Sequence, residues 1–438
     1  MTVLIFPLSR IEGHAQVVIE EQDGQVISAH FQAEEMRGFQ HFVQGAPAEQ
    51  MPVIVPRICG VCSTAHHVAA VKALEDIYNV EPPPLAHKIR ELLMLGQLIQ
   101  NQATSLFFFT MPDRLNVASI FQAAAEEQGD EKERSGIALR ALQVRQAGTS
   151  LISVAGGQFI HPVKAVVGGI SSGISPEACQ PMRAELSRAL PLACELIDYY
   201  WQMSLELRER IGTWGDDAPA YYLTSTNDTF PNYTGNLLRV MGPDGEVNDI
   251  FPVHRFRAYL KFEETEYSYA GQTSYREEVM RANSLARINM ARAMGTFRAD
   301  EYLARFHDTF GRPAHGILLY DLCRGIELVY AIERALEILE QPLDQGHTAA
   351  AHTPRDGEGY GLVEAPRGPL IHHYRVENGL IAEAEFVIPT VHNIRAIERA
   401  LTVAAQRYIN SERINLELER AVGRVVRSFD PCIACATH

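Results

Sequence analysis

The sequence predicts an α+β fold that is mostly helical, with a core of long helices and small β-hairpins at the periphery. Three observations predict it. Apolar residues recur at helical spacing over long segments, short alternating segments flank Asp-Gly and Asn-Gly turns, and hydrophobic residues make up 46% of the 438 residues, enough for a large core. No linker interrupts the chain, so we expect one domain, residues 1–438, around a single core.

Two β-hairpins are the clearest strand signals. Residues 15–35, AQVVIEEQDGQVISAHFQAEE, alternate apolar and polar side chains on both sides of Asp23-Gly24. Residues 372–390, HHYRVENGLIAEAEFVIPT, do so around Asn378-Gly379. Two segments are less regular. Residues 214–261 are rich in Gly, Pro, Asn and aromatic residues and contain a third predicted hairpin at MGPDGEV, and residues 347–361 are predicted to form a loop.

Long helices account for most of the remaining chain. The segments on either side of Pro82, Pro83 and Pro84 carry apolar residues three and four positions apart, which is typical of amphipathic helices. The proline run separates them, because proline cannot continue a helix interior. The predicted helices cover residues 64–78, 85–109, 133–153, 176–211, 276–297, 318–340, 393–410 and 411–429.

Composition limits the partners and the compartment. The chain carries 39 Lys and Arg against 54 Asp and Glu, a formal charge of -15. Such an acidic surface repels phosphate backbones and anionic lipids, which argues against nucleic acid as a partner. No stretch approaches the ~20 consecutive apolar residues of a membrane helix, and MTVLIFPLSRIEGHA lacks the basic start of a secretory signal. We therefore expect a cytoplasmic protein that does not contact a membrane.

Seven cysteines are sparse for this length and odd in number, which argues against a disulfide framework and for a reducing compartment. Three of them, Cys179, Cys194 and Cys323, stand alone within helical patterns. Isolated cysteines in such positions behave as small apolar side chains, so we expect these three to be buried in the core.

The other four cysteines form two Cys-x-x-Cys pairs at opposite ends of the chain, Cys59 with Cys62 and Cys432 with Cys435. Thiolates at i and i+3 can face one side of a turn, and two such pairs make a four-sulfur site that suits zinc, iron–sulfur, or nickel and iron. Zinc ribbons keep their pairs ~15–20 residues apart, whereas here the two ends of a large fold must meet. The spacing predicts a metal site buried at the centre, and leaves open whether the metal is structural zinc or a catalytic or redox metal.

The residues that flank the cysteines distinguish between these metals. The motifs RIEGHA at 10–15, RICGVC at 57–62 with His66 just beyond, EAPRG at 364–368 and DPCIACATH at 430–438 occur in this order. Together they closely resemble the large, catalytic subunit of nickel–iron hydrogenases. The segments MRGFQHFV, VEAPRGPLIHHYRVENGLI and IPTVHN look most like its cytoplasmic, bidirectional members, which are coupled to NAD(P) or ferredoxin. The resemblance implies reversible oxidation of H2.

The resemblance also implies the metal centre. In the family, four thiolates bind nickel, two of them bridge to an iron, and the iron carries one CO and two cyanides. Cys59 and Cys432 correspond to the terminal nickel ligands, and Cys62 and Cys435 to the bridges. Soft thiolates suit a nickel that changes oxidation state, and a terminal thiolate such as Cys432 can take the proton when a Lewis-acidic metal polarises H2.

Two further catalytic roles follow from the same resemblance. Glu12 corresponds to the carboxyl that passes protons from a terminal thiolate, and the alternative is an ion pair with Arg10 or another cation. Arg367 corresponds to an arginine that overhangs the open metal position, where it donates to a cyanide or acts on H2; a structural ion pair is the alternative. Asp430 either hydrogen-bonds to Arg367 or caps its turn.

Other residues correspond to the surroundings of the two metals. Pro389 and Thr390, in IPTVHN, match residues around the cyanides, where a hydroxyl donor is expected. His66 matches a histidine near a bridging sulfur, or is a satisfied core histidine.

The chain departs from the family pattern at three positions. Gln40 stands where many relatives carry a Glu that helps to bind magnesium or iron beside the C-terminal His438. An amide oxygen ligates a hard cation without charge, so we expect a cation held by His438, waters and Gln40. Asn101 and Gln102 stand where relatives often have Asp or Ser followed by His. Precursors of relatives are usually cut just after the histidine that corresponds to His438, where this sequence ends. The sequence therefore resembles the processed form of such a precursor, or the product of a gene that never encoded an extension.

Two alternatives come from other classes of protein. One is the related quinone-module subunit of respiratory complex I, which lacks the paired cysteines. The other is a structural zinc protein with four cysteine ligands and an interaction role, which the flanking motifs do not favour.

Partners are implied by the route that electrons must take. The chain has no third cysteine cluster for an iron–sulfur relay, so we expect an iron–sulfur small subunit, and beyond it flavin-, NAD(P)- or ferredoxin-linked subunits. No G-x-G-x-x-G follows a predicted strand, so this chain does not bind the nucleotide itself. Residues 214–261 and the N-terminal β region are candidates for the contact, and the physiological acceptor stays open.

Overall fold

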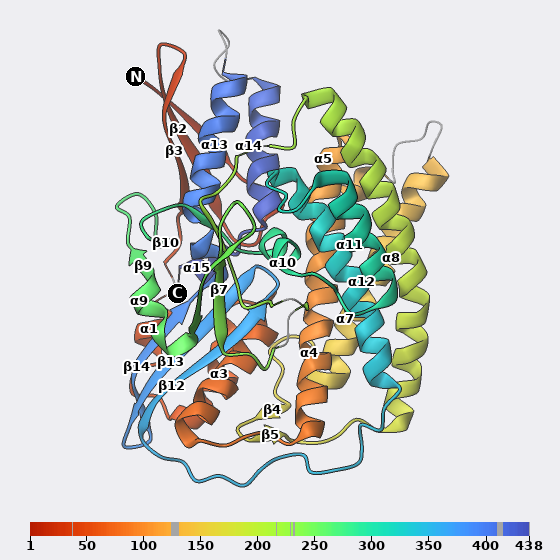
Figure 1. The fold of residues 1–438 in the computed structure, drawn as a ribbon, viewed down its shortest axis with the longest axis vertical. Helices are drawn as coiled ribbons and strands as arrows, with labels where there is room; N and C mark the ends of the chain where they lie inside the picture. Colours follow the sequence, from red (N-terminus) through yellow and green to blue (C-terminus); the bar gives the residue numbers. More distant parts are fainter. Residues whose placement is uncertain are drawn as a thin grey trace.

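Long helices form one side of the molecule and contain much of its hydrophobic core (Figure 1). The computed structural model describes residues 1–36, 38–123, 131–215, 217–227, 229–230, 233–409 and 415–437. The bundle consists of α4 (Pro84–Ala103), α7 (Glu131–Gly156), α8 (Pro176–Ile211), α11 (Phe297–Phe310) and α12 (Tyr320–Leu339). α4 and α8 each pack against both α7 and α12, and α11 packs on α12. The predicted fold class, mostly helical α+β, is confirmed.

Small residues bring α4 and α7 close together. A Cβ added at Gly148 of α7 would lie 2.5 Å from the backbone nitrogen of Gln100 in α4, and one at Gly96 would lie 3.0 Å from Ile152. Side chains larger than glycine would therefore separate the two helices and open the core. The predicted helix 176–211 has the bounds of α8, and α4 continues through a π-helical segment, Thr104–Thr110, to the end predicted for it.

The prediction of one helix over residues 276–297 is wrong. The chain is helical there only in α10 (Ser284–Met290), which begins where the Asn283 side chain accepts a hydrogen bond from the Ser284 backbone N–H. Before it, Arg276 and Glu277 have positive φ, and β11 (Met280–Arg281) pairs in parallel with β6 (Tyr221–Thr224). Positive φ is incompatible with a right-handed helix, and pairing with a distant strand outweighs the local periodicity.

A three-stranded antiparallel sheet at the N-terminus packs on the helices near the C-terminus. It contains β1 (Thr2–Pro7), β2 (Ala15–Gln22) and β3 (Gln25–Ala33) in that order. The predicted hairpin is β2–β3, and β1 adds a strand beside it. β3 packs against α13 (Ile394–Tyr408), which packs against α14 (Leu416–Phe429). Of the predicted helix 411–429, residues 411–414 lie outside the described part of the chain.

A second antiparallel sheet covers α3 (Ser63–Tyr78) and contains β12 (Gly357–Ala365), β13 (Gly368–Glu377) and β14 (Leu380–Val387). β13–β14 is the predicted hairpin. The prediction of a loop through residue 361 is wrong, because residues 357–361 belong to β12. Here a Cβ at Gly359 would lie 2.5 Å from the Ala73 carbonyl oxygen of α3, so the glycine allows strand and helix to touch.

The region between α8 and α10 holds a second, smaller core. Leu223, Val240, Phe251 and Met280 contribute to it, and the predicted MGPDGEV hairpin joins two of its strands. The remaining strands are β4 (Ala165–Val166), β5 (Gly169–Ile170), β7 (Leu237–Met241), β8 (Val247–Pro252), β9 (Leu260–Glu263) and β10 (Gln272–Tyr275). The remaining short helices are α1 (Phe39–Phe42), α2 (Met51–Ile54), α5 (Met111–Leu115), α6 (Ile120–Ala123), α9 (Phe256–Tyr259) and α15 (Ile433–Ala436), with 3-10 turns at Ala48–Gln50, Val55–Ile58, Val253–Arg255, Ile317–Leu319 and Pro389–His392.

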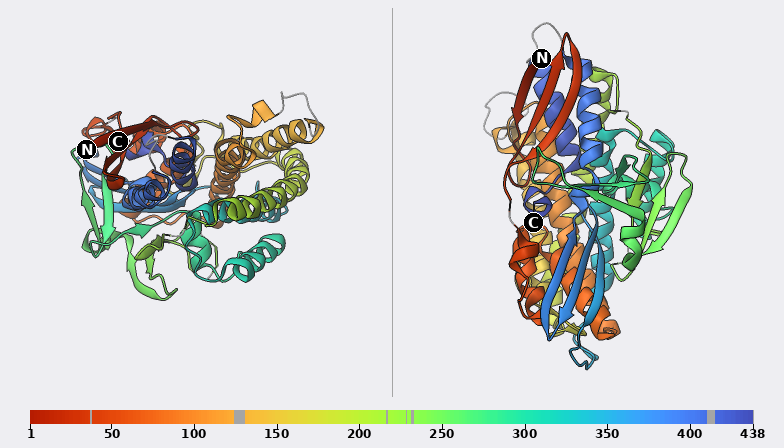
Figure 2. Two further views of the ribbon diagram at one scale, coloured as in Figure 1. Left: turned by 90° about the horizontal axis from the view of Figure 1, so that it is seen from above. Right: turned by 90° about the vertical axis from the view of Figure 1, so that its left-hand side faces the viewer.

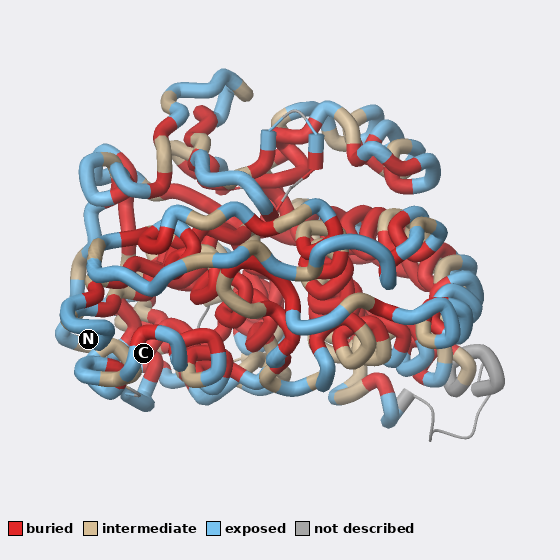
Figure 3. The backbone as a smooth tube through the Cα atoms, turned by 90° about the horizontal axis from the view of Figure 1, so that it is seen from below, coloured by how far each residue is buried: buried red, intermediate tan, exposed pale blue. Residues whose placement is uncertain are grey.

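The segment that follows β1 meets the C-terminal segment inside the molecule, where Glu12 forms a β-bridge with Cys432. After α14 the chain turns into α15, which lies midway along the long axis between the N-terminal sheet and the β12–β14 sheet (Figure 2). Buried residues fill the interior of the molecule, while exposed residues follow the outer loops and helix faces (Figure 3). None of the described helices is long and apolar enough to cross a membrane.

Candidate metal centre

The first cysteine pair brackets the start of a helix. Cys59 follows the 3-10 turn Val55–Ile58 with an extended backbone, and Cys62 is the N-cap residue of α3. Between them the Val61 backbone N–H donates to the Cys59 sulfur at 3.3 Å. This local turn points both sulfur atoms to one side, as the i and i+3 spacing predicts.

The second pair has a similar local structure at the other end of the chain. Cys432 is the N-cap residue of α15, and Cys435 lies in that helix. The Sγ–Sγ distances are 3.4 Å from Cys59 to Cys432, 3.0 Å from Cys62 to Cys435 and 2.8 Å from Cys432 to Cys435. All four sulfurs lie within 4.8 Å of one another, and all are buried. The structure therefore brings both pairs to one four-sulfur site in the interior.

Electrostatics favours a cation among these sulfurs. Burial raises the pKa of the Cys432 and Cys435 thiols, because a thiolate loses its solvation there. Several buried thiolates at such short distances need a positive charge between them. A bound metal ion supplies that charge and displaces the thiol protons.

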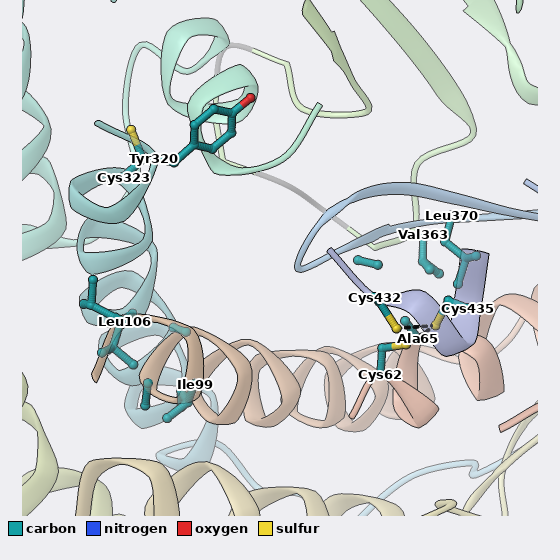
Figure 4. Packing of buried hydrophobic residues seen from close by; sticks show 14 of the residues in the cluster. Cys62, Ala65, Ile99, Leu106, Tyr320, Cys323, Val363, Leu370, Cys432 and Cys435 are labelled. Atoms are coloured by element: carbon teal, nitrogen blue, oxygen red, sulfur yellow. Dashed lines mark hydrogen bonds between the residues drawn. The ribbon is translucent and has the colours of Figure 1, made fainter. Parts of the chain in front are cut away.

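The remaining three cysteines do not join the site. Cys179, Cys194 and Cys323 are free and buried in the core, as predicted. Cys323 lies on α12, well away from the sulfurs of Cys62, Cys432 and Cys435 (Figure 4).

The segment with Glu12 lies directly on the last turn of the chain. Glu12 forms a β-bridge with Cys432, and the Ile433 backbone N–H donates to the Glu12 carbonyl at 3.1 Å. Gly13 makes this approach possible: it has φ +81°, and a Cβ there would lie 2.7 Å from the Ile433 Cβ. In the motif RIEG, Gly13 therefore lets the backbone approach Ile433 closely, and Glu12 supplies the side chain that faces the site.

The Glu12 carboxylate faces the sulfur site. Its Oε2 accepts from the Cys432 thiol at 3.1 Å and from the Ala434 backbone N–H at 3.1 Å. Burial and the nearby Cys59 sulfur raise the pKa of Glu12. Arg10, the alternative partner, pairs instead with Asp113 at 2.6 Å. Glu12 is therefore a partly buried carboxyl able to hold a proton beside one sulfur.

Arg367 enters the site from the turn between β12 and β13. Its Nε donates to the backbone oxygen of Asp430 at 2.5 Å, and its Nη2 donates to Asp430 Oδ1 at 3.2 Å. Asp430 has positive φ at the C-terminus of α14, so it both caps that helix and pairs with Arg367. Arg367 Nη1 is buried and has no hydrogen-bond partner among the described residues.

A small cavity lies beside the sulfurs and Arg367. The Thr390 hydroxyl, at its edge, accepts from the Cys432 backbone N–H at 3.0 Å, which leaves its own O–H hydrogen to donate elsewhere. The cavity is lined mainly by apolar groups and by the candidate site residues: Cys62, Ala65, His66, Ala365, Pro366, Arg367, Leu370, Ile388, Pro389, Thr390, Cys432 and Cys435.

His66 contacts the site through a sulfur. Its Nε2 lies 3.5 Å from the Cys435 Sγ, and its Nδ1 lies 3.0 Å from His372 Nε2. Tyr374 is next along this hydrogen-bonded chain. Neither His372 nor Tyr374 was predicted from the sequence, although the signal was available in HHY, because alternate residues of a strand face the same side.

Gln40 is not among the residues that line the cavity beside the sulfurs. It is half-buried in α1 and lines a cavity of about 650 Å³ together with Ala436 and Thr437. His438, the other residue expected to hold a cation, lies outside the described residues. Gln40 is therefore close to the end of the described chain, and the expected cation site stays a prediction.

A buried ion-pair network, which the sequence did not reveal, supports the Arg367 turn. Arg287 pairs with Glu327 at 2.7 Å and with Glu364 at 3.0 Å. It also donates to the carbonyls of Ala365 and Pro366, at 3.1 and 2.7 Å. Two of the three departures from the family pattern belong to the same polar interior, since Gln102 donates to Glu327 and Asn101 donates to Asp430.

Arg287→Met is expected to destabilise the protein by about 3–5 kcal/mol, because it leaves two carboxylates buried without their cation. Urea unfolding of the purified protein measures this. The control is Arg183→Met, which breaks a half-exposed pair with Glu340 and should change the stability by at most about 1 kcal/mol. Similar unfolding midpoints for the two variants would show that the Arg287 network is not structural.

Comparisons with known proteins agree with this geometry. A family model described as nickel-dependent hydrogenase matches residues 37–136 and 220–438, and one described as HoxL-like matches residues 2–36. The vhu F420-non-reducing hydrogenase of Methanococcus voltae contains a subunit that is 34% identical over 422 residues, covering 92% of this chain and 98% of that protein. The NAD-reducing hydrogenase HoxS subunit beta of Cupriavidus necator is 30% identical, covering 100% and 94%.

A solved structure shows the same fold. The crystal structure of an NAD+-reducing NiFe-hydrogenase in the H2-reduced state superimposes with a TM-score of 0.91 and 29% identity, and each chain is covered completely. The chain belongs to the nickel-dependent hydrogenase family. The resemblance inferred from the motifs is confirmed, and the protein is a hydrogenase rather than either of the two alternatives.

Proposed function

We propose that this chain splits and forms H2 at a nickel–iron centre, with Cys59 and Cys432 as terminal nickel ligands and Cys62 and Cys435 as bridges to iron. We also propose that the iron carries CO and two cyanides. The observation that carries the proposal is the buried Nη1 of Arg367, which has no hydrogen-bond partner among the described residues and lies beside a cavity lined by three of the four cysteines. A structural zinc site is closed and needs neither a cavity nor a spare donor.

The surroundings of the cavity fit small acceptor ligands. Arg367 offers an N–H and Thr390 an O–H, and both are groups that bind cyanide nitrogen. Pro389 and Leu370 supply apolar wall, which suits CO. Buried polar groups without partners are costly, so these donors favour an occupant that accepts hydrogen bonds.

Protein groups provide the acid–base chemistry in this proposal. The metal centre, when bound, acts as a Lewis acid that polarises H2. The Cys432 sulfur takes a proton, and Glu12 Oε2, 3.1 Å away, receives it. Because burial raises the pKa of Glu12, this carboxyl holds a proton more readily than an exposed glutamate. Arg367 keeps its charge beside the site, fixed by Asp430.

Electrons leave, we propose, through an iron–sulfur small subunit to flavin-, NAD(P)- or ferredoxin-linked subunits in the cytoplasm. The loop with Cys59 reaches the surface at Gly60. Three exposed apolar residues lie on the segments that flank this loop: Val53 at 46%, Ile160 at 50% and Val163 at 46% exposure. The loop at 157–163 is held there by a hydrogen bond from the His161 backbone N–H to Ser63 Oγ, 3.4 Å long. A cluster docked on this surface would lie beside the loop that carries Cys59, a proposed nickel ligand.

Val163→Asp is expected to weaken small-subunit binding about tenfold or more, because a charge in an apolar interface centre is poorly solvated. Ile250→Asp is the matched control, since Ile250 is 54% exposed in the alternative contact, residues 214–261. Co-purification and H2-dependent reduction of a viologen dye measure the effect. Loss of binding in the Ile250 variant alone would move the contact to that segment.

We further propose that Gln40 and His438 hold a magnesium or iron ion. The cavity beside Gln40 and Thr437 supports this assignment.

Metal analysis and infrared spectroscopy of the purified complex test the main proposal. Nickel with iron, and absorption bands of diatomic ligands, are expected. Zinc alone, or no bound metal, would contradict the proposed nickel–iron centre.

A further inference from the structure

A chain of hydrogen bonds runs from one sulfur of the metal site into the β12–β14 sheet. The Cys435 Sγ lies 3.5 Å from His66 Nε2, and His66 Nδ1 lies 3.0 Å from His372 Nε2. His372 Nδ1 in turn lies 2.7 Å from the Tyr374 hydroxyl oxygen. His66 is 1% exposed, and His372 and Tyr374 are 0% exposed. These groups therefore form a relay that solvent does not reach.

The far end of the relay decides the direction of its hydrogen bonds. Within the described part of the chain, the Tyr374 hydroxyl has one hydrogen-bond partner, His372 Nδ1. Burial raises the pKa of Tyr374 well above its ordinary value, so the hydroxyl keeps its hydrogen. A buried O–H without an acceptor costs about 1–3 kcal/mol. The Tyr374 hydroxyl therefore donates to His372 Nδ1.

Each following step is then determined. A neutral imidazole has one nitrogen that donates and one that accepts. Because His372 accepts at Nδ1, its Nε2–H donates to His66 Nδ1. Because His66 accepts at Nδ1, its Nε2–H points at the Cys435 sulfur. The reverse order would leave the tyrosine hydrogen unpaired and direct a nitrogen lone pair at a thiolate.

The position of these residues on β13 agrees with a dedicated relay. His372 and Tyr374 are two residues apart on the strand and face the same side. His373, between them, faces the other way and pairs with Glu358 at 2.7 Å. The Tyr374 ring packs edge-on against Phe386, 6.3 Å between centroids. Phenylalanine would satisfy that packing, so the hydroxyl serves the hydrogen bond.

We propose that Tyr374 is a positioning residue which, through His372, fixes His66 as an Nε2–H donor to the Cys435 sulfur and so tunes the electron density of the metal site. The inference rests on the proposed function, in which Cys435 bridges nickel and iron. A hydrogen bond to a thiolate withdraws electron density from it, and hydrogen bonds to metal ligands tune metal centres in this way. Iron then donates less density to CO than it would without the relay.

Tyr374→Phe in the complete, metal-loaded complex tests this. The ring and its contact with Phe386 remain, and only the hydroxyl is lost. The CO and cyanide infrared bands of the H2-reduced enzyme should shift to lower wavenumber, with nickel and iron contents unchanged. The control is Tyr360→Phe, whose hydroxyl bonds to Glu358 at 2.5 Å on the neighbouring strand and whose loss should leave the bands in place.

Bands in Tyr374→Phe that coincide with those of the unchanged enzyme would overturn the inference. If Tyr374→Phe does not accumulate with metal, the pair His372→Gln and His372→Leu replaces it. Glutamine retains a donor and an acceptor, so its bands should lie closer to the original ones than those of the leucine variant. Equal bands in the two variants would also overturn the inference. Failure of the proposed function gives a different result, the absence of these bands from every variant and from the unchanged complex.

Discussion

Cys62→Ser is expected to yield a protein without nickel, iron or H2 turnover. Cys62 is 7% exposed, and its sulfur lies 3.0 Å from that of Cys435. A serine oxygen is a hard ligand that stays protonated at neutral pH and cannot replace a soft thiolate that bridges two metals. Metal analysis of the purified complex, together with H2-dependent dye reduction, measures the loss.

The matched control for this substitution is Cys323→Ala. Cys323 is 0% exposed in α12 and lies apart from the sulfur site (Figure 4). Removing its sulfur leaves a small cavity that costs about 1 kcal/mol, but the metals should stay bound. A Cys62→Ser protein with full nickel, iron and activity would disprove the ligand assignment.

Glu12→Gln is expected to lower H2 turnover and hydrogen–deuterium exchange with solvent by about 10²–10⁴-fold, the usual contribution of a general acid–base group. Glutamine keeps the size of the side chain and can still accept the hydrogen bond from the Ala434 backbone N–H, 3.1 Å long in the native protein. It cannot take up and release a proton. The infrared bands of the iron ligands should therefore persist while exchange falls.

The pH dependence gives a second readout of Glu12. Its pKa is raised above the ordinary value by burial, so it remains partly protonated at a pH where an exposed glutamate is ionised. The exchange rate should change as the pH crosses this raised pKa, and Glu12→Gln should abolish that step. The control is Glu35→Gln, a carboxylate 60% exposed beside His14. Exchange at the normal rate in the Glu12 variant would remove this residue from the proton route.

Local pattern was sufficient for the long elements. The helix over residues 176–211 and the hairpins around Asp23-Gly24 and Asn378-Gly379 were predicted with nearly their observed bounds. In each case the signal lies within the segment itself, as apolar periodicity or as turn residues that favour positive φ. Packing in the folded protein reinforces the same choice, so the prediction needs no knowledge of the partner segments.

Segments decided by distant contacts were predicted poorly. Residues 276–297 have helical periodicity, yet Met280 and Arg281 pair with β6, because the parallel partner is supplied by a strand far away in the sequence. Residues 357–361 resemble a loop rich in glycine, yet they form part of β12, where the absence of a side chain lets the strand lie on α3. Composition alone cannot reveal which backbone a glycine approaches.

Residue type and spacing within short motifs were enough to establish the family, the two cysteine pairs and the candidate roles of Glu12 and Arg367, because ligand chemistry depends on just these properties. The meeting of the pairs as four buried sulfurs within 4.8 Å, and the pairing of Arg10 with Asp113 instead of Glu12, could be seen only in the folded chain. The same holds for the approach of His372, Tyr374 and Arg287 to the site. Their positions follow from packing between segments that lie far apart in the sequence, and the low dielectric of that shared interior gives each hydrogen bond its strength.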